Sequence, residues 1–167
     1  RIDARQAGFM GAEIGATIPF STFSPALEGF GFTGGGGYSR SRVETTTGAT
    51  SSIPGYSKWT ANATLYFERA GFNARGSARY RSTFLGDFTG FGGSPTPPQA
   101  VAETIIDAPI GYDFPPGSAL EGLSLYVQGQ NLTDERFASV ANTATPLQVI
   151  DYQIYGRRFL AGFTFKF

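Results

Sequence analysis

Apolar and polar side chains alternate without interruption between residues 58 and 68, and this pattern restricts the stretch to β-structure. One set of alternate positions is apolar: Trp59, Ala61, Ala63, Leu65 and Phe67. The positions between them are polar or amphipathic: Thr60, Asn62, Thr64, Tyr66 and Glu68. Because successive side chains of a strand point to opposite faces, we predict a strand with one apolar and one polar face. An aromatic ring stands at each end of the apolar face, about 26 Å apart at ~3.3 Å per residue, which suits two bilayer interfaces.

A second alternating stretch covers residues 72–83, after a short turn at 68–71. Its apolar face also has an aromatic residue near each end, Phe72 and Tyr80. Its polar face carries Arg75, Arg79 and Arg81. An arginine at the middle of a lipid bilayer costs ~2–4 kcal/mol, so we expect these arginines to face water or a hydrated lumen. Together the two stretches predict a β-hairpin.

Five further stretches have the character of strands, which brings the prediction to seven: 10–20, 30–43, 106–113, 123–130 and 155–167. The connections alternate between short ones (21–29, 68–71, 114–121) and long ones (44–56, 85–100, 132–154). Short periplasmic turns and longer extracellular loops are typical of outer-membrane barrels. We therefore predict an all-β fold, an antiparallel transmembrane β-barrel portion. Single-chain bacterial barrels normally have an even number of strands, so seven strands suggest part of a larger barrel.

The composition excludes several functional classes. The 167 residues include no His and no Cys, which removes Ser-His-Asp triads, thiol nucleophiles and thiolate metal sites. Thirteen basic and 13 acidic residues balance, and a nucleic-acid binder would need a basic face. We expect no catalytic residues, cofactor or metal. No run approaches the ~18 apolar residues of a membrane helix. Because the chain begins at Arg1, we expect a mature segment or a fragment.

An ordered set of short motifs adds a family resemblance. Asn131-Leu132-Thr133-Asp134-Glu135 is followed by Tyr155-Gly156-Arg157-Arg158-Phe159 and by a terminal Phe167. Upstream stand Gly11-Ala12-Glu13, Ile53-Pro54-Gly55-Tyr56-Ser57-Lys58 and Tyr80-Arg81-Ser82. In this order and spacing, the set resembles the end of TonB-dependent outer-membrane receptors, and the resemblance covers residues 7–167.

The resemblance implies a plugged barrel of about 22 strands, of which residues 1–167 would form the last seven. The plug, the TonB box and the earlier strands would lie outside this chain. It also implies an integral place in a bacterial outer membrane, with extracellular loops and a periplasmic C-terminus. The implied partners are the rest of the receptor, the TonB complex, outer-membrane lipid and lipopolysaccharide. The implied function is import of a scarce nutrient such as siderophore-bound iron, cobalamin or a glycan, whose identity stays open.

Site candidates follow from the pattern and from the resemblance. Arg75, Arg79 and Arg81 are lumen-facing candidates. They either pair with plug carboxylates or with Glu68 and Asp107, or form an electrostatic path for an anionic ligand. The aromatic ligand candidates in the long loops are Phe88, Phe91, Tyr152 and Tyr155. The final aromatic residues, Phe163, Phe165 and Phe167, resemble a barrel-assembly signal and equally suit a lipid-facing surface.

Four other arginines, Arg40, Arg42, Arg157 and Arg158, are expected near the extracellular rim, where they meet either lipopolysaccharide phosphates or solvent. Two alternative functions remain open at this point. One is a receptor-like barrel that serves as a docking surface for a surface lipoprotein or another partner. The other is a soluble all-β sandwich that binds glycans, against which the paired aromatic positions argue.

Overall fold

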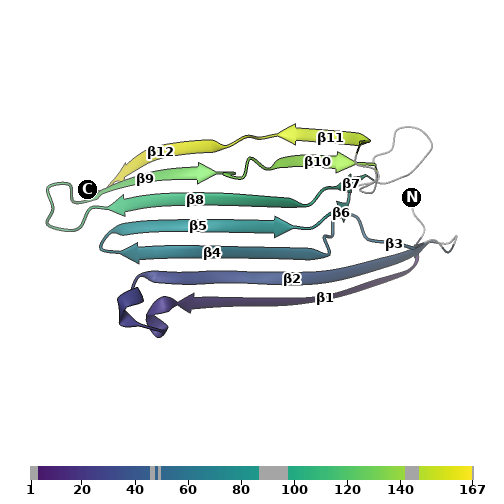
Figure 1. Ribbon diagram of the computed structural model, residues 1–167, viewed down its shortest axis with the longest axis horizontal. Helices are drawn as coiled ribbons and strands as arrows, with labels where there is room; N and C mark the ends of the chain where they lie inside the picture. Colours follow the sequence, from purple (N-terminus) through teal and green to yellow (C-terminus); the bar gives the residue numbers. More distant parts are fainter. Residues whose placement is uncertain (1–3, 46–47, 49, 87–97, 142–146, 167) are drawn as a thin grey trace.

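The computed structural model describes residues 4–45, 48, 50–86, 98–141 and 147–166. Its main feature is an open antiparallel sheet of seven long strands that lie in chain order (Figure 1). These strands are β1 (Ala4–Pro19), β2 (Phe30–Thr45), β4 (Trp59–Arg69), β5 (Phe72–Arg81), β8 (Glu103–Asp113), β9 (Leu123–Gln130) and β12 (Arg158–Phe165). The short strand β3 (Thr50–Ser51) pairs with the end of β2. The all-β, antiparallel prediction is therefore confirmed, and β1 and β12 are the two edges of this sheet.

Each of the seven predicted stretches overlaps one of the long strands. The glycine-rich β2 is the least obvious of them, because glycine weakens a strand. Its four consecutive glycines, Gly34 to Gly37, are paired on both sides, for example Gly36 with Ile14 of β1 and with Ala61 of β4. Pairing along both edges supplies the backbone hydrogen bonds that hold this glycine run in extended form.

A second, smaller sheet has the order β11-β10-β7-β6. It consists of β6 (Phe84–Leu85), β7 (Gln99–Ala100), β10 (Arg136–Val140) and β11 (Val149–Ile154). Figure 1 shows it on the right, beyond the ends of β5, β8, β9 and β12, with β10 following β9 and β11 leading into β12. The expectation that 44–56, 85–100 and 132–154 are loops is thus wrong in part. The strands within them have only two to six residues, too few to give a recognisable alternation.

The opposite end of the main sheet carries the short connections. Between β1 and β2 lie two 3-10 helices, η1 (Phe20–Thr22) and η2 (Pro25–Leu27). Between β4 and β5, Ala70 and Gly71 both have positive φ angles, 52° and 82°, as a two-residue hairpin turn requires. Among the residues that the structure describes, no helix has the length and apolarity needed to cross a membrane.

The strand register divides the main sheet into two faces, because directly paired residues of antiparallel strands point to the same side. One face has an aromatic row near the short turns: Phe30, Phe67, Phe72, Tyr112 and Phe163. A second row lies toward the long connections: Tyr38, Trp59, Tyr80 and Phe159. Between the rows the side chains are small or aliphatic, including Ile14, Gly34, Ala63, Ala78 and Val127. We call this charge-free zone the apolar band.

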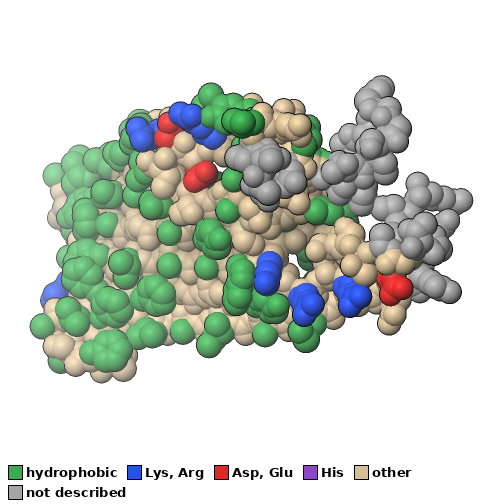
Figure 2. Space-filling view, turned by 45° about the vertical axis from the view of Figure 1, so that its right-hand side comes forward, with side chains coloured by type: hydrophobic (Ala, Val, Ile, Leu, Met, Phe, Trp, Pro, Cys, Tyr) green, Lys and Arg blue, Asp and Glu red, His purple; other side chains and the backbone are tan. Residues whose placement is uncertain are grey.

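The apolar band is largely exposed. Ile14 is 80% exposed and Phe163 is 72% exposed. The buried residues among those described are Gly31, Ser57, Ala100, Gly111, Gly129, Ser139 and Val140, and no large side chain among them is fully buried. In Figure 2, hydrophobic side chains spread over the left and middle of the visible face, whereas charged side chains lie mainly toward its margins. An apolar surface this extensive signals contact with something other than water.

Candidate functional site

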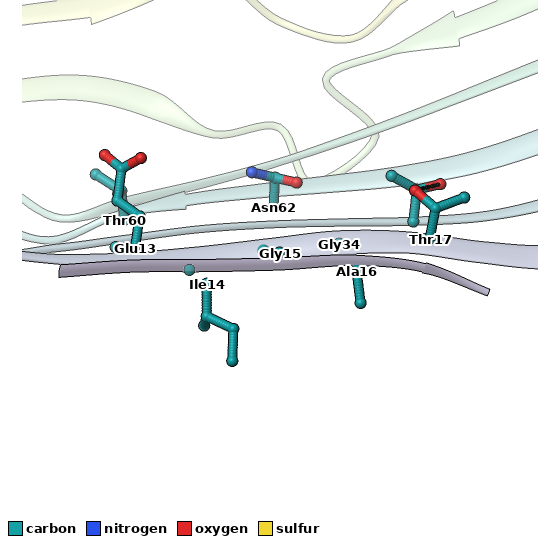
Figure 3. A pocket seen from close by; sticks show the side chains of 12 residues that line it. Glu13, Ile14, Gly15, Ala16, Thr17, Gly34, Thr60 and Asn62 are labelled. Carbon is teal, nitrogen blue, oxygen red and sulfur yellow. Dashed lines mark hydrogen bonds between the residues drawn. The ribbon is translucent and has the colours of Figure 1, made fainter.

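The opposite side of the main sheet, the polar face, is hollowed over β1, β2 and β4. Figure 3 shows Glu13, Thr17, Thr60 and Asn62 on this side, whereas Ile14 and Ala16 point the other way. The hollow has a volume of about 570 Å³ and a floor that includes Gly15 and Gly35, and we call it the glycine-floored recess. A Cβ atom on Gly35 would lie 2.8 Å from the carbonyl oxygen of Ile14, so the two backbones approach closely there.

The three predicted arginines of β5 lie on the polar face, in register with polar residues of β4. Arg75 pairs with Glu68 at 2.5 Å, and Arg79 lies 3.8 Å from the Asp107 carboxylate. Both partners are the neighbouring carboxylates named from the sequence. All four side chains are at least partly exposed, so these pairs contribute little to stability.

Arg81 plays a different, structural part. Its Nε donates a hydrogen bond to Ser57 Oγ at 2.6 Å, and its Nη2 donates to the carbonyl oxygen of Gly55 at 2.5 Å. Its guanidinium also lies 3.7 Å from the centre of the Phe84 ring. Arg81 therefore holds the segment that leads into β4 in place, with two of its N–H donors engaged there.

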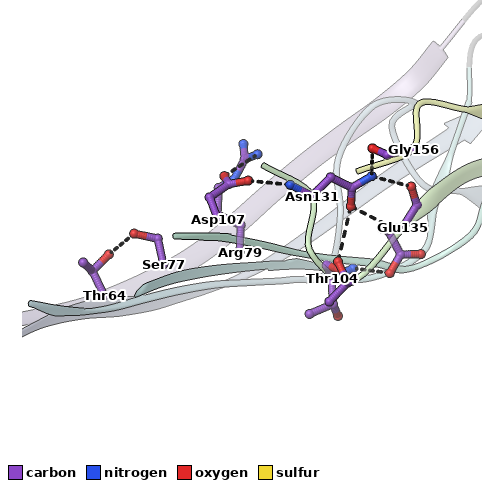
Figure 4. A network of polar contacts seen from close by, with 9 residues as sticks. Thr64, Ser77, Arg79, Thr104, Asp107, Asn131, Glu135 and Gly156 are labelled. Carbon is purple, nitrogen blue, oxygen red and sulfur yellow. Dashed lines mark hydrogen bonds and ion pairs between the residues drawn. The ribbon is translucent and has the colours of Figure 1, made fainter. Parts of the chain in front are cut away.

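Asn131 is the centre of a polar network at the junction of β9 and β10 (Figure 4). Its backbone has a positive φ of 52°, a conformation that asparagine tolerates better than most residues. Its Nδ2 donates to the carbonyl oxygens of Glu135 and Gly156 at 3.0 and 3.1 Å. Its Oδ1 accepts from the Glu135 amide at 2.8 Å. One amide side chain thus joins the start of β10 to the segment before β12.

Further bonds tie this network to β8, and we call the whole arrangement the Asn131 clasp. The backbone N–H of Asn131 donates to Asp107 Oδ1 at 2.9 Å, and Thr133 Oγ1 donates to the Thr104 carbonyl oxygen at 2.8 Å. In return, the Thr104 amide donates to Glu135 Oε2 at 3.1 Å. The side chains replace the ladder hydrogen bonds that are lost where the strand is interrupted.

A pocket of about 330 Å³ lies against the clasp. Its lining combines both signs of charge, with Arg79, Arg136 and Arg158 facing Glu103, Asp107 and Glu135. Such a mixed lining offers both donors and acceptors to a polar molecule. The hydrogen bond that Arg136 Nη1 donates to the Tyr152 hydroxyl, 2.7 Å long, is the main cause that raises the pKa of Arg136.

The aromatic candidates of the long connections are only partly described. Tyr152 belongs to β11 and not to a loop, which corrects the prediction, and its hydroxyl accepts the bond from Arg136. Tyr155 directly follows β11, lines the clasp pocket and bonds through its hydroxyl to Gln153. Phe88 and Phe91 lie outside the described residues.

The C-terminal aromatic residues lie on β12. Phe163 and Phe165 stand on the apolar face, directly opposite Leu125 and Leu123 of β9, and both are exposed. Phe167 lies outside the described residues. Their part in barrel assembly stays a prediction.

The Asn131 clasp is not among the sequence-based predictions, in which residues 131–135 and 155–159 serve only as family motifs. The signal was present in the residue types. Asparagine, threonine and aspartate are the side chains that bond to nearby backbone groups in turns, and a glycine stands at position 156 of the second motif. Their contact across 25 residues could not be read from spacing alone.

Within the described ranges, no cluster of three or more Asp, Glu, His or Cys side chains is arranged to hold a metal ion. The candidate site is the polar face of the main sheet, with the glycine-floored recess and the pocket beside the Asn131 clasp. The apolar band lies on the other face of the same sheet. Comparison of the chain with known protein families, with curated proteins and with solved structures gave no match.

Proposed function

We propose that this chain forms part of the wall of a β-barrel in a bacterial outer membrane, in a receptor of the TonB-dependent kind that imports a scarce nutrient. The observation that carries the proposal is the apolar band, which crosses seven strands without a charged side chain and is bounded by aromatic rows. An outward apolar band flanked by aromatic girdles is how barrels match a bilayer. The motif resemblance supports the narrower assignment to this kind of receptor.

The slant of the aromatic row toward the long connections supports the membrane part of the proposal. Tyr80 pairs with Thr104 of β8, whereas Phe159 lines up through Gly129 with Ala108, four residues farther along β8. The row thus runs obliquely to the strands. Strands of such barrels are tilted by about 35–45° from the bilayer normal, so a level girdle must cross them obliquely.

The polar face supports the import part of the proposal. In a closed barrel this face would line a hydrated lumen, and the open edges of β1 and β12 would pair with further strands. The glycine-floored recess leaves room for material that packs inside the lumen. Of the three arginines of β5, Arg79, whose pair with Asp107 is loose at 3.8 Å, is the most available to attract an anionic ligand.

Fractionation and uptake test the proposal together. We expect the protein to sediment with outer membranes, to resist extraction by carbonate and to require detergent for release. In cells that express the whole receptor, we expect energy-dependent uptake of one member of a panel of ferric siderophores, cobalamin and oligosaccharides. Arg79→Glu should reduce uptake several-fold if that ligand is anionic, because the new carboxylate would face Asp107. Unchanged uptake by Arg79→Glu would remove the electrostatic path.

One observation favours a second function, a docking surface for a partner that covers the loop end. β11 is one of the two edge strands of the small sheet and exposes Ile150 and Ile154, at 56% and 62%. Co-purification in mild detergent tests this. Ile150→Ser combined with Ile154→Ser should release such a partner, whereas Leu160→Ser on β12 should not. If no chain copurifies with the unaltered protein, the docking function is excluded.

A further inference from the structure

Three cations gather on the apolar side of the sheet, immediately beyond the aromatic row of Tyr38 and Trp59. Arg40 and Arg42 follow Tyr38 at intervals of two along β2, so all three point to the same face. Lys58 precedes Trp59, and its Nζ lies 5.8 Å from the centre of the Tyr38 ring. Arg40, Arg42 and Lys58 are all exposed, and we call them the cationic triad.

The triad lacks the neighbours that neutralise other cations of this sheet. On β1 the residues opposite Arg40 and Arg42 are Met10 and Gly8, neither of which carries a charge. Within the described part of the chain, ion pairs involve Arg69, Arg75, Arg79 and Arg136 but no member of the triad. The polar face matches arginines with carboxylates at ion-pair distance. On this side Glu44 follows Arg42 at the same interval of two along β2, but among the described residues it forms no ion pair with the triad.

The triad also borders an open hollow of about 680 Å³. Tyr38 forms part of its wall, and the hydroxyl-bearing residues Thr50, Ser51 and Ser52 form another part. By strand rise, Arg40 and Arg42 are about 7 Å apart at their Cα atoms, so one anionic group can contact both side chains. The site therefore combines guanidinium forks, an ammonium group and hydroxyls around space that a ligand can enter.

We propose that the cationic triad binds the phosphate of a lipid headgroup at the surface of the bilayer. The inference rests on the proposed membrane function, because the aromatic row then marks the interface and the triad stands at headgroup level just outside it. Guanidinium groups bind phosphate oxygens through paired hydrogen bonds, and the lysine adds a point charge. Continuity with the apolar band makes a lipid the occupant, since its acyl chains lie on the band while its phosphate meets the triad.

Trp59 provides a built-in reporter, because it is the single tryptophan of the chain and its ring centre lies 4.6 Å from that of Tyr38. The receptor that contains this chain, with every other tryptophan replaced by phenylalanine, is reconstituted in phosphatidylcholine vesicles that contain an equal share of phosphatidylglycerol, with bromine placed on the chains of one lipid or the other. We expect brominated phosphatidylglycerol to quench Trp59 more strongly than brominated phosphatidylcholine does. Each cation that contacts the lipid should enrich phosphatidylglycerol near Trp59 about fivefold.

Two double variants test whether the lipid preference depends on the triad itself and not on the total charge of the protein. Arg40→Gln combined with Arg42→Gln should make the two brominated lipids nearly equal as quenchers, and Arg40→Glu combined with Arg42→Glu should reverse the preference. The matched control, Arg75→Gln with Arg79→Gln, removes the same charge from the polar face and should keep the preference. Circular dichroism verifies that each variant retains its β-structure.

The outcomes are distinct. Equal quenching by both lipids in the unaltered chain would overturn the triad proposal and leave the membrane proposal standing. A preference that survives Arg40→Gln combined with Arg42→Gln would likewise overturn it, because the enrichment of the anionic lipid would then not depend on the triad. Absence of quenching by either lipid would mean that Trp59 does not meet the bilayer, and both proposals would fall.

Discussion

At the scale of single residues, Gly71 shows how tightly the turn between β4 and β5 is specified. Its φ is 82°, and a Cβ atom there would lie 2.2 Å from the backbone carbonyl oxygen of Asp113. Gly71→Ala should therefore destabilise the protein by about 2 kcal/mol or more, since both the φ angle and the contact are unfavourable. Urea unfolding followed by circular dichroism measures this change.

The control for this substitution is Gly76→Ala in the middle of β5. Nothing lies within 4 Å of a Cβ atom at Gly76. The change should be neutral or slightly stabilising, because alanine reduces the freedom of the unfolded chain. A similar loss of stability for both variants would contradict this account of the turn.

Asn131 is the residue whose chemistry is least replaceable in the clasp. Asn131→Asp preserves shape but loses the two bonds that Nδ2 donates to carbonyl oxygens, and it places a negative charge beside them. We expect a loss of about 2–3 kcal/mol in the free energy of unfolding at neutral pH. Asn62→Asp, on the exposed polar face, is the matched control and should change stability little. Equal effects would mean that the clasp contributes nothing specific.

At the scale of elements, β4 was predictable almost to the residue, and its neighbours follow from the same alternation. The predicted stretch 58–68 and the observed strand Trp59–Arg69 differ by one residue at each end. The alternation of side chains along β5 also predicts that Arg75 and Arg79 lie on the polar face, as observed. Local alternation fixes which way each side chain points, and the register then brings Arg79 to Asp107.

The small sheet and the clasp could not be predicted in the same way. β7 has two residues and pairs with β6 and β10, and β10 lies more than 30 residues farther along the chain. Such pairing depends on where the long strands place their ends, and a local pattern does not contain that information. The same is true of Asn131 and Gly156, which meet only because β9 and β12 pair.

Two adjacent positions of β4 test the division into faces. Ala63 lies in the apolar band, and Asn62 faces the glycine-floored recess. Ala63→Arg should reduce the stability of the membrane-inserted protein by about 2–4 kcal/mol, because the charge would enter lipid. Asn62→Arg adds the same charge on the hydrated side and should cost far less. Urea titration in phosphatidylcholine vesicles compares the two, and a larger effect at Asn62 would contradict the assignment of faces.

At the scale of the whole molecule, the sheet has the organisation of a protein wall rather than that of a globular core. Its few buried residues are small, and its large hydrophobic side chains are exposed. A sheet in water normally buries one face against another layer. Here the apolar band has no such layer among the described residues, and the proposal is that lipid takes that place.

The most direct test of this claim places a tryptophan on either face at the same depth. In a Trp59→Phe background, Leu65→Trp puts the reporter in the apolar band, and Tyr66→Trp puts it on the polar face. Phosphatidylcholine brominated deep in its acyl chains should quench the tryptophan at 65 strongly and the one at 66 weakly. Aqueous acrylamide should show the opposite order. Strong acrylamide quenching at 65, without quenching by the brominated lipid, would contradict the membrane account.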